Sequence, residues 1–137
     1  MLAKQRYEGL QTLFLAAHNW ACLFLCMLSI AEEYTGHEID FIEAYHACTK
    51  NGSLRATDFT CNDSEVILKT LTGKKWHRDK VKKLPEPVPS AMYTVEHWYN
   101  PKTKYDHYKR RGYDTVTNSV TVRDGKLLEY YTYTVEA

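Results

Sequence analysis

The stretch NWACLFLCML, Asn19 to Leu28, lies in the most apolar part of the chain and carries two cysteines four residues apart. Asn19 is a favoured residue for starting a helix, so the stretch predicts a helix from about Trp20 to about Tyr34. Its apolar run ends at Ala31 and has about 12 residues, whereas a membrane-spanning helix needs about 20. We therefore expect a buried core helix and no membrane span.

The composition is typical of one globular domain. The chain has 137 residues, of which 26% are charged and 44% are apolar, and its net charge is +1. This balance provides no electrostatic attraction to nucleic acid or to a membrane surface. The basic stretches Lys74–Lys83 and Arg110-Arg111 are more typical of a solvated face. We expect a protein or peptide partner, and no nucleic acid or membrane.

Four cysteines permit three disulfide pairings, and they are Cys22, Cys26, Cys48 and Cys61. The N-terminal residues do not form a convincing export signal, because Glu8 and Gln11 interrupt the apolar pattern and no clean cleavage site follows. In a chain of this length, thiols are then the better expectation. The sequence predicts a cytoplasmic protein without disulfides.

Further helices are predicted on both sides of the apolar one. Residues 4–15 and 38–48 have helical spacing, and a fourth helix begins at Asp63 or Ser64 and is closed by Gly73. Residues 74–92 change in character, since a polar, basic stretch is followed by three prolines within five residues. Proline at that density excludes a helix, so we expect an internal connector.

Alternating apolar residues and turn signals predict strands after the connector. Asp124-Gly125 between apolar runs is a strong hairpin signal. The sequence therefore predicts one α+β domain over residues 1–137, with N-terminal helices packed on a C-terminal antiparallel sheet. The helical part is about 1–73, the connector about 74–92 and the sheet about 93–137. The predicted strands are 93–99, 104–109, 114–116, 119–123 and 127–135.

Cys22 is the candidate nucleophile. In the first turn of the predicted helix, unpaired backbone N–H groups and the helix dipole favour a thiolate, which is the reactive form. Cys26 lies one turn deeper and has the character of a packing residue. The alternative is that both cysteines are small core residues, as buried cysteines commonly are.

His107 and Asp114 are the candidate base and orienting group. If Arg110-Arg111-Gly112 forms a three-residue turn, Asp114 lies almost opposite His107 on the neighbouring strand, where side chains can meet. Asp106 points to the other face of the strand and is a poorer partner. The alternative is that both residues decorate the surface of a tyrosine-rich hairpin.

This order of residues resembles the papain-like cysteine peptidases, especially the bacteriocin-processing, cysteine-peptidase-like branch. Two stretches carry the resemblance: NWACLFLCMLSIAEE, and EHWYNPKTKYDHYKRRGYDTVTNSVTVRDGK. They are also similar to a family of short phage and plasmid proteins with a W-G-C-Y-F-L-C-L type helix start and a W-Y-N, Y-x-H-F, Y-D ending. The resemblance implies a papain-like α+β fold.

The resemblance also implies roles for particular residues, with Cys22 as nucleophile, His107 as base and Asp114 as orienting group. Papain-like enzymes use an upstream glutamine as an oxyanion donor, and Ala16 stands near that place here. Asn19 or the backbone N–H of Cys22 would then stabilise the oxyanion. We expect a peptidase or amidase that cleaves a peptide or isopeptide bond without a cofactor.

Two other interpretations remain open. A catalytically inactive phage or mobile-element protein of the same fold could bind a host protein, because tyrosine and tryptophan anchor interfaces. A metal shared by Cys22 and Cys26 with His97 or His107 is disfavoured, since paired C-x-x-C motifs are absent. The aromatic residues that would form the binding surface are Trp98, Tyr99, Tyr105, Tyr108, Tyr130, Tyr131 and Tyr133.

Overall fold

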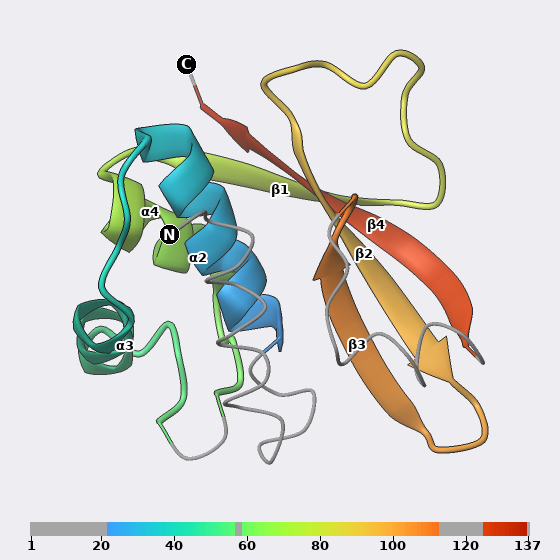
Figure 1. The fold of residues 1–137 in the computed structure, drawn as a ribbon, viewed down its shortest axis with the longest axis horizontal. Coiled ribbons are helices and arrows are strands. Elements are labelled where there is room, and N and C mark those ends of the chain that lie inside the picture. The colour runs from blue at the N-terminus through green and yellow to red at the C-terminus, as the bar shows by residue number, and fades with distance from the viewer. Residues whose placement is uncertain (1–21, 57–58, 113–124, 137) are drawn as a thin grey trace.

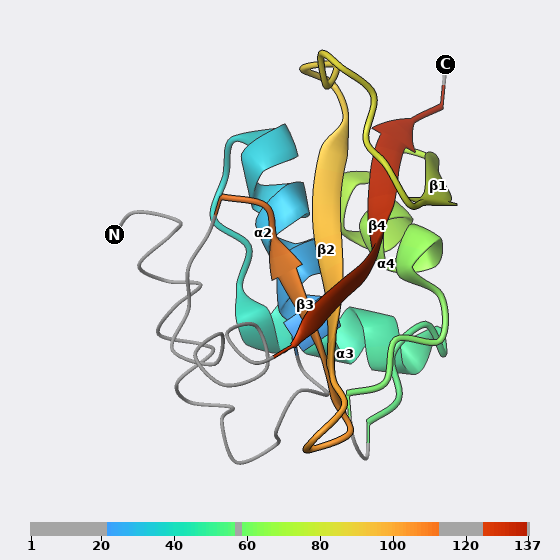
Figure 2. The same cartoon turned by 90° about the vertical axis from the view of Figure 1, so that its right-hand side faces the viewer.

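Helices and an antiparallel sheet form two layers (Figures 1 and 2). The structure is a computed structural model that describes residues 22–56, 59–112 and 125–136. The helices in these ranges lie on one side of the sheet, which confirms the α+β class. They are α2 (Cys22–Thr35), α3 (Phe41–Lys50) and α4 (Ser64–Thr72), and the strands are β1 (Trp76–Val81), β2 (Tyr93–Asn100), β3 (Tyr105–Arg110) and β4 (Lys126–Val135).

The described strands pair in the order β1-β4-β2-β3, and every pair is antiparallel. The last strand in the sequence therefore lies between the first two, and β3 lies at an edge of the described sheet. The predicted strands 93–99, 104–109 and 127–135 are confirmed as β2, β3 and β4. The helix predicted at 4–15 and the strands predicted at 114–116 and 119–123 fall outside the described residues.

Helix α2 forms the centre of the core. Ten of its 14 residues are buried, including Ser29 and Glu32, so the helix is enclosed on most of its circumference. It packs against α4 and β3, and its apolar side chains join those of Ile67, Trp76 and Val95 in one core cluster. None of the helices within the described ranges has the length and apolar character required to traverse a bilayer.

Short polar side chains begin both α3 and α4. The sequence predicts this start for α4, whereas α3 begins at Phe41, after Asp40, and not at residue 38. The Asp40 carboxylate accepts a hydrogen bond from the Glu43 N–H at 2.9 Å, and the Asp63 carboxylate accepts one from the Val66 N–H at 3.1 Å. Gly73 ends α4 with φ of 74°, a left-handed conformation that glycine adopts without steric cost. The predicted start and end of α4 are confirmed.

The predicted connector at 74–92 is wrong for residues 76–81, which form β1. Trp76 is buried against the rings of Tyr34 and Tyr93, whereas His77 is exposed. β1 pairs only with β4 among the described strands, and an edge strand tolerates charged side chains. Four charged or histidine residues lie between Trp76 and Val81, so this stretch lacks the alternating apolar residues that predict a strand. Trp76 is its one buried residue.

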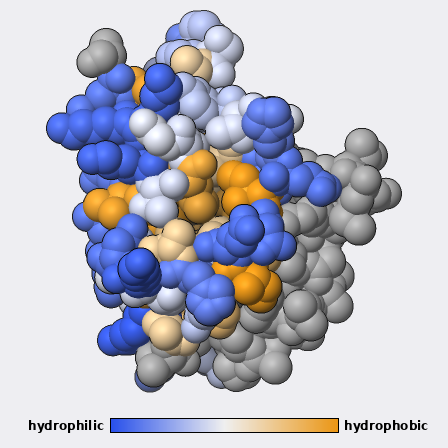
Figure 3. Space-filling model, turned by 90° about the vertical axis from the view of Figure 1, so that its left-hand side faces the viewer, coloured by the Kyte–Doolittle hydropathy of each residue, from blue (hydrophilic) through white to orange (hydrophobic). Residues whose placement is uncertain are grey.

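Large apolar side chains that remain exposed are scattered over different elements. The described ones are Tyr34 on α2, Ile42 on α3, Tyr105 on β3 and Leu128 on β4. On the face shown in Figure 3, apolar patches are interrupted by hydrophilic residues. This distribution is ordinary for a folded domain and does not mark one continuous apolar surface.

The cap of α4 provides a test of the helix boundary. Substituting Asp63→Ala should lower the free energy of unfolding by about 1 kcal/mol, because the Val66 N–H loses its acceptor. Asp63→Asn should restore most of the loss, since asparagine caps about as well as aspartate. Chemical denaturation of the three proteins measures both differences, and an unchanged midpoint for Asp63→Ala would contradict this role.

Candidate functional site

The start of α2 lies beside β3, and the contact is made by the candidate nucleophile. Cys22 is the first residue of α2 as described, and its Sγ accepts a hydrogen bond from the Tyr108 N–H at 3.3 Å. The two residues are 86 positions apart in the sequence. Figures 1 and 2 both show this end of α2 next to β3. Folding therefore brings the Cys22 sulfur to the residue that follows His107.

The position of β3 at the edge of the sheet formed by the described strands explains this contact. In an antiparallel pair, alternate N–H groups of an edge strand point away from their neighbour strand. Tyr108 lies opposite His97 on β2, and its N–H donates instead to the Cys22 sulfur. A helix start packed against this edge can thus bond directly to the strand backbone.

His107 is fully buried, with no measurable exposed surface, and it lies opposite Trp98 on β2. It is the residue before Tyr108, so its backbone adjoins the group that contacts the Cys22 sulfur. Asp106, its other neighbour, bonds elsewhere, as the alternation of side chains predicts. The expected partners Asp114 and Asn19 lie outside the described residues.

Burial decides the protonation of Cys22. Only 2% of its surface is exposed, and this burial raises the pKa of the thiol strongly, with a smaller contribution from Cys26. Hydrogen bonds from the backbone N–H groups of Tyr108, Leu23 and Cys22 itself act in the opposite direction. The N–H groups at the helix start therefore lower the pKa of Cys22, as expected, but burial raises this pKa by more. Cys22 is consequently a neutral thiol at pH 7.

The four cysteines, all described, are thiols that share one region of the core. Cys26 and Cys48 are fully buried core residues, and Cys61 packs against the same cluster. Burial raises the pKa of Cys61, and nearby Cys22, Cys26 and Cys48 raise it further. The expectation of thiols is confirmed, and packing accounts for Cys26, Cys48 and Cys61.

A second polar cluster, which the sequence did not predict, joins three strands. His97 on β2 is buried, and its Nε2 lies 2.8 Å from an Asp106 oxygen on β3 while its Nδ1 lies 3.0 Å from a Glu129 oxygen on β4. The imidazole also stacks on Tyr108, with ring centroids 4.3 Å apart. Because both nitrogens face carboxylates, His97 is not placed to accept a proton from Cys22.

The sequence held a weak signal for this cluster. Asp106 and Tyr108 share a face of β3, and His97 occupies a strand that could pair with it. The pairing register of the strands brings the two carboxylates and the imidazole together, and the register between β2 and β4 contains a bulge after His97. The cluster also depends on the order of the strands, which local sequence does not predict.

The predicted aromatic surface is wrong for two of its members. Tyr133 is fully buried and its hydroxyl bonds to the Ser64 hydroxyl at 3.0 Å, while Tyr131 is 5% exposed. Tyr108 is engaged by the His97 ring. These tyrosines support the helices and the His97 cluster, so they do not form a docking surface. Tyr105, half exposed, is the most accessible of the set.

Glu129 gives the His97 cluster a pH dependence. The hydrogen bond with His97 lowers the pKa of Glu129 below its ordinary value of 4.5, and Lys80 adds to this effect. A lowered pKa in the folded state stabilises the fold above the ordinary value, and this stabilisation is lost as the pH falls through the lowered pKa. Below both values Glu129 contributes nothing through its charge.

Substituting Glu129→Gln should therefore lower the free energy of unfolding by about 1 kcal/mol at neutral pH, and the difference from wild type should shrink below about pH 4.5. Denaturant unfolding at several pH values measures it. Glu136→Gln is the control, because Glu136 forms an exposed 3.5 Å pair with Lys75 and should change little. A constant difference across the acidic range would contradict the role of Glu129.

Metal ligands are not assembled in the described ranges, where no three His, Cys, Asp or Glu residues form a group that could hold a metal ion. No family model, curated protein or solved structure matches this chain. The function is therefore inferred from the residues and their geometry.

Proposed function

We propose that the protein is a small papain-like cysteine peptidase or amidase that attacks a peptide or isopeptide carbonyl through Cys22. One observation supports this proposal above the others: the 3.3 Å hydrogen bond from the Tyr108 N–H to the Cys22 sulfur. It joins a cysteine at a helix start to the strand that carries His107. The papain-like resemblance implies a helix-start cysteine beside a histidine on the following sheet, and the strand residue that contacts the sulfur here, Tyr108, directly follows His107.

In the proposed reaction, the Cys22 sulfur attacks the carbonyl carbon while His107 accepts the thiol proton. The backbone N–H of Cys22, or Asn19, stabilises the oxyanion, and Asp114 holds the His107 tautomer. The C–N bond then breaks as His107 protonates the leaving amine, which leaves a thioester on Cys22. Water, deprotonated by His107, hydrolyses the thioester and regenerates the thiol.

The raised pKa of Cys22 determines how this reaction would start. Burial keeps the sulfur protonated at neutral pH, so no thiolate stands ready before the substrate binds. The proton must move to His107 as the carbon–sulfur bond forms, which is general-base catalysis. The three backbone N–H groups around the sulfur would stabilise the negative charge that develops on it.

A second candidate is an inactive protein of the same fold that binds a host protein. The burial of Cys22 and His107, at 2% and 0% exposed, favours it, because a substrate carbonyl must reach both groups. Under this interpretation Cys22 only stabilises the contact between α2 and β3, and His107 is a buried residue of that strand. Binding would then be indifferent to the chemistry of the thiol.

Labelling by a peptide with a C-terminal acyloxymethyl ketone separates these candidates. This electrophile occupies the place of a substrate carbonyl, so it should modify Cys22 faster than Cys26 at neutral pH. Substituting His107→Ala should slow modification of Cys22 about 100-fold, which is a typical contribution of a general base. Mass spectrometry of the intact protein and of its peptides gives the site and the rate.

His46→Ala is the matched control, because His46 is exposed on α3, and its labelling rate should equal that of wild type. Thermal melting shows whether His107→Ala folds. The comparison of Cys22 with Cys26 uses only wild type, so it stands even if that variant unfolds. Equal labelling of the two cysteines would overturn the peptidase proposal. Capture of the same host protein by wild type and Cys22→Ala would favour the second candidate.

A further inference from the structure

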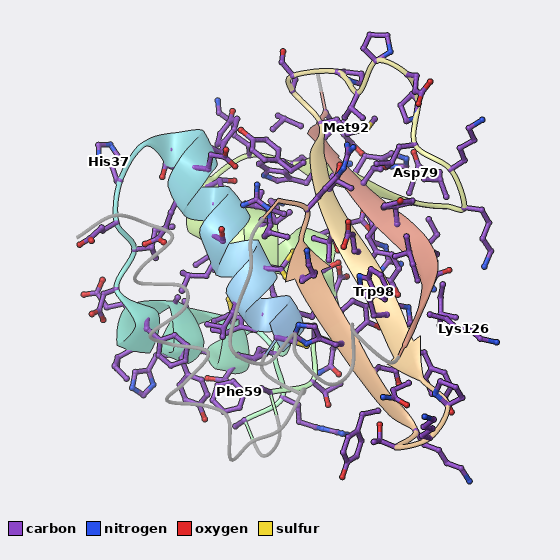
Figure 4. The ribbon with its side chains drawn as sticks, turned by 45° about the vertical axis from the view of Figure 1, so that its right-hand side comes forward. His37, Phe59, Asp79, Met92, Trp98 and Lys126 are labelled. Atoms are coloured by element: carbon purple, nitrogen blue, oxygen red, sulfur yellow. The ribbon has the colours of Figure 1, made fainter. Side chains whose placement is uncertain are left out.

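A pocket of about 350 Å³ lies at the C-terminal end of β3, and Cys22 is not among the residues that line it. It is formed where the later turns of α2, the start of β2, the end of β3 and the segment before β2 meet (Figure 1). Figure 4 labels Met92 at the point where that segment enters β2, and Met92 lines the pocket. The volume is within the range of small-molecule pockets.

Two consecutive arginines supply the positive charge of this pocket. Arg110 is the last residue of β3 and Arg111 lies in the turn that follows, so the strict alternation of strand side chains has ended and both can line the same cavity. The Arg111 N–H bonds to the Thr94 carbonyl at 3.3 Å, which holds this turn beside β2.

Arg110 is fixed in place before any ligand binds. It is 6% exposed, and its guanidinium donates to the Ser29 hydroxyl at 2.8 Å and to the Glu33 carboxylate at 2.7 Å. The guanidinium also lies 5.8 Å from the centre of the Tyr93 ring. A cation held in this way loses little conformational freedom on binding an anion.

The charges of the lining leave one positive charge in excess. Two guanidinium groups face one carboxylate, that of Glu33, and Glu33 already pairs with Arg110. Arg111 is exposed, and no described acidic side chain forms an ion pair with it. The lining therefore matches a ligand with a single negative charge.

The remaining side chains require a ligand with an apolar part. Val88, Met92 and Tyr93 contribute apolar surface, while Ser90 and Thr94 contribute hydroxyl groups. An arginine binds a carboxylate through two parallel hydrogen bonds, and a hydroxyl can donate to the same oxygens. Inorganic phosphate carries more charge and has nothing to place against Val88 and Met92.

We propose that this pocket binds a carboxylate joined to a small apolar group, such as the C-terminus of a peptide that ends in an apolar residue or a free N-acyl amino acid. Arg111 would bind the carboxylate, Arg110 would add positive charge to the same pocket, and Met92 and Val88 would contact the apolar group. The site does not depend on the proposed hydrolase, and it would exist in an inactive protein.

Isothermal titration of the full chain with four probes tests this inference: N-acetyl-leucine, its neutral amide, the peptide acetyl-Ala-Ala-Leu with a carboxyl terminus, and inorganic phosphate. At least one of the two leucine carboxylates should bind about tenfold more tightly than the amide, as expected for the loss of a charge-assisted hydrogen bond. Phosphate should bind more weakly than that carboxylate. Tighter binding of the peptide assigns the pocket to peptide C-termini, and binding of N-acetyl-leucine alone assigns it to a free acid.

Arg111→Gln should weaken carboxylate binding about tenfold, and its exposed position makes a folding defect unexpected. Lys102→Gln is the control, because Lys102 is an exposed cation in the turn between β2 and β3 and does not line the pocket. Its affinity should equal that of wild type. Equal binding of amide and acid, no effect of Arg111→Gln, or tighter binding of phosphate would overturn the proposal.

Discussion

The burial of α2 against α4 and the sheet is the constraint on which the rest of the structure depends. Ten of its 14 residues are removed from water, and the apolar ones among them supply much of the core. Two residues of β3 are tied to this helix: the Tyr108 N–H bonds to the Cys22 sulfur, and Arg110, the last residue of the strand, bonds to Ser29 and Glu33. These bonds hold β3 against α2, and its pairing with β2 sets the register of the side chains that it carries.

The same burial sets the chemistry of the candidate nucleophile. A cysteine at a helix start receives backbone N–H groups that favour a thiolate, and these groups are present around Cys22. Removing the sulfur from water has the larger effect, so the resting thiol is neutral. A protein with this arrangement would need the base and the substrate together before the sulfur becomes nucleophilic.

A polar cluster centred on His97 also holds β3, on the side of the strand that faces β2. His97 bridges carboxylates on two neighbouring strands, and its ring lies on Tyr108, the residue whose N–H reaches Cys22. The His97 cluster and the helix start therefore meet at one residue. Two residues after Tyr108, Arg110 bonds the same strand to α2 and lines a separate pocket.

Local sequence determined the helices and strands whose signals lie within a few residues. Asp40, Asp63 and Gly73 set the ends of α3 and α4 through bonds to their own neighbours, and alternation identified β2, β3 and β4. The same pattern did not predict β1, because this strand carries charged residues in place of alternating apolar ones. Tertiary structure alone decided the strand order, the His97 cluster and the two-arginine pocket, since each joins residues from different elements. It also decided the pKa of Cys22, because α2 supplies only the N–H groups of Cys22 and Leu23, while the burial and the Tyr108 N–H come from the rest of the fold.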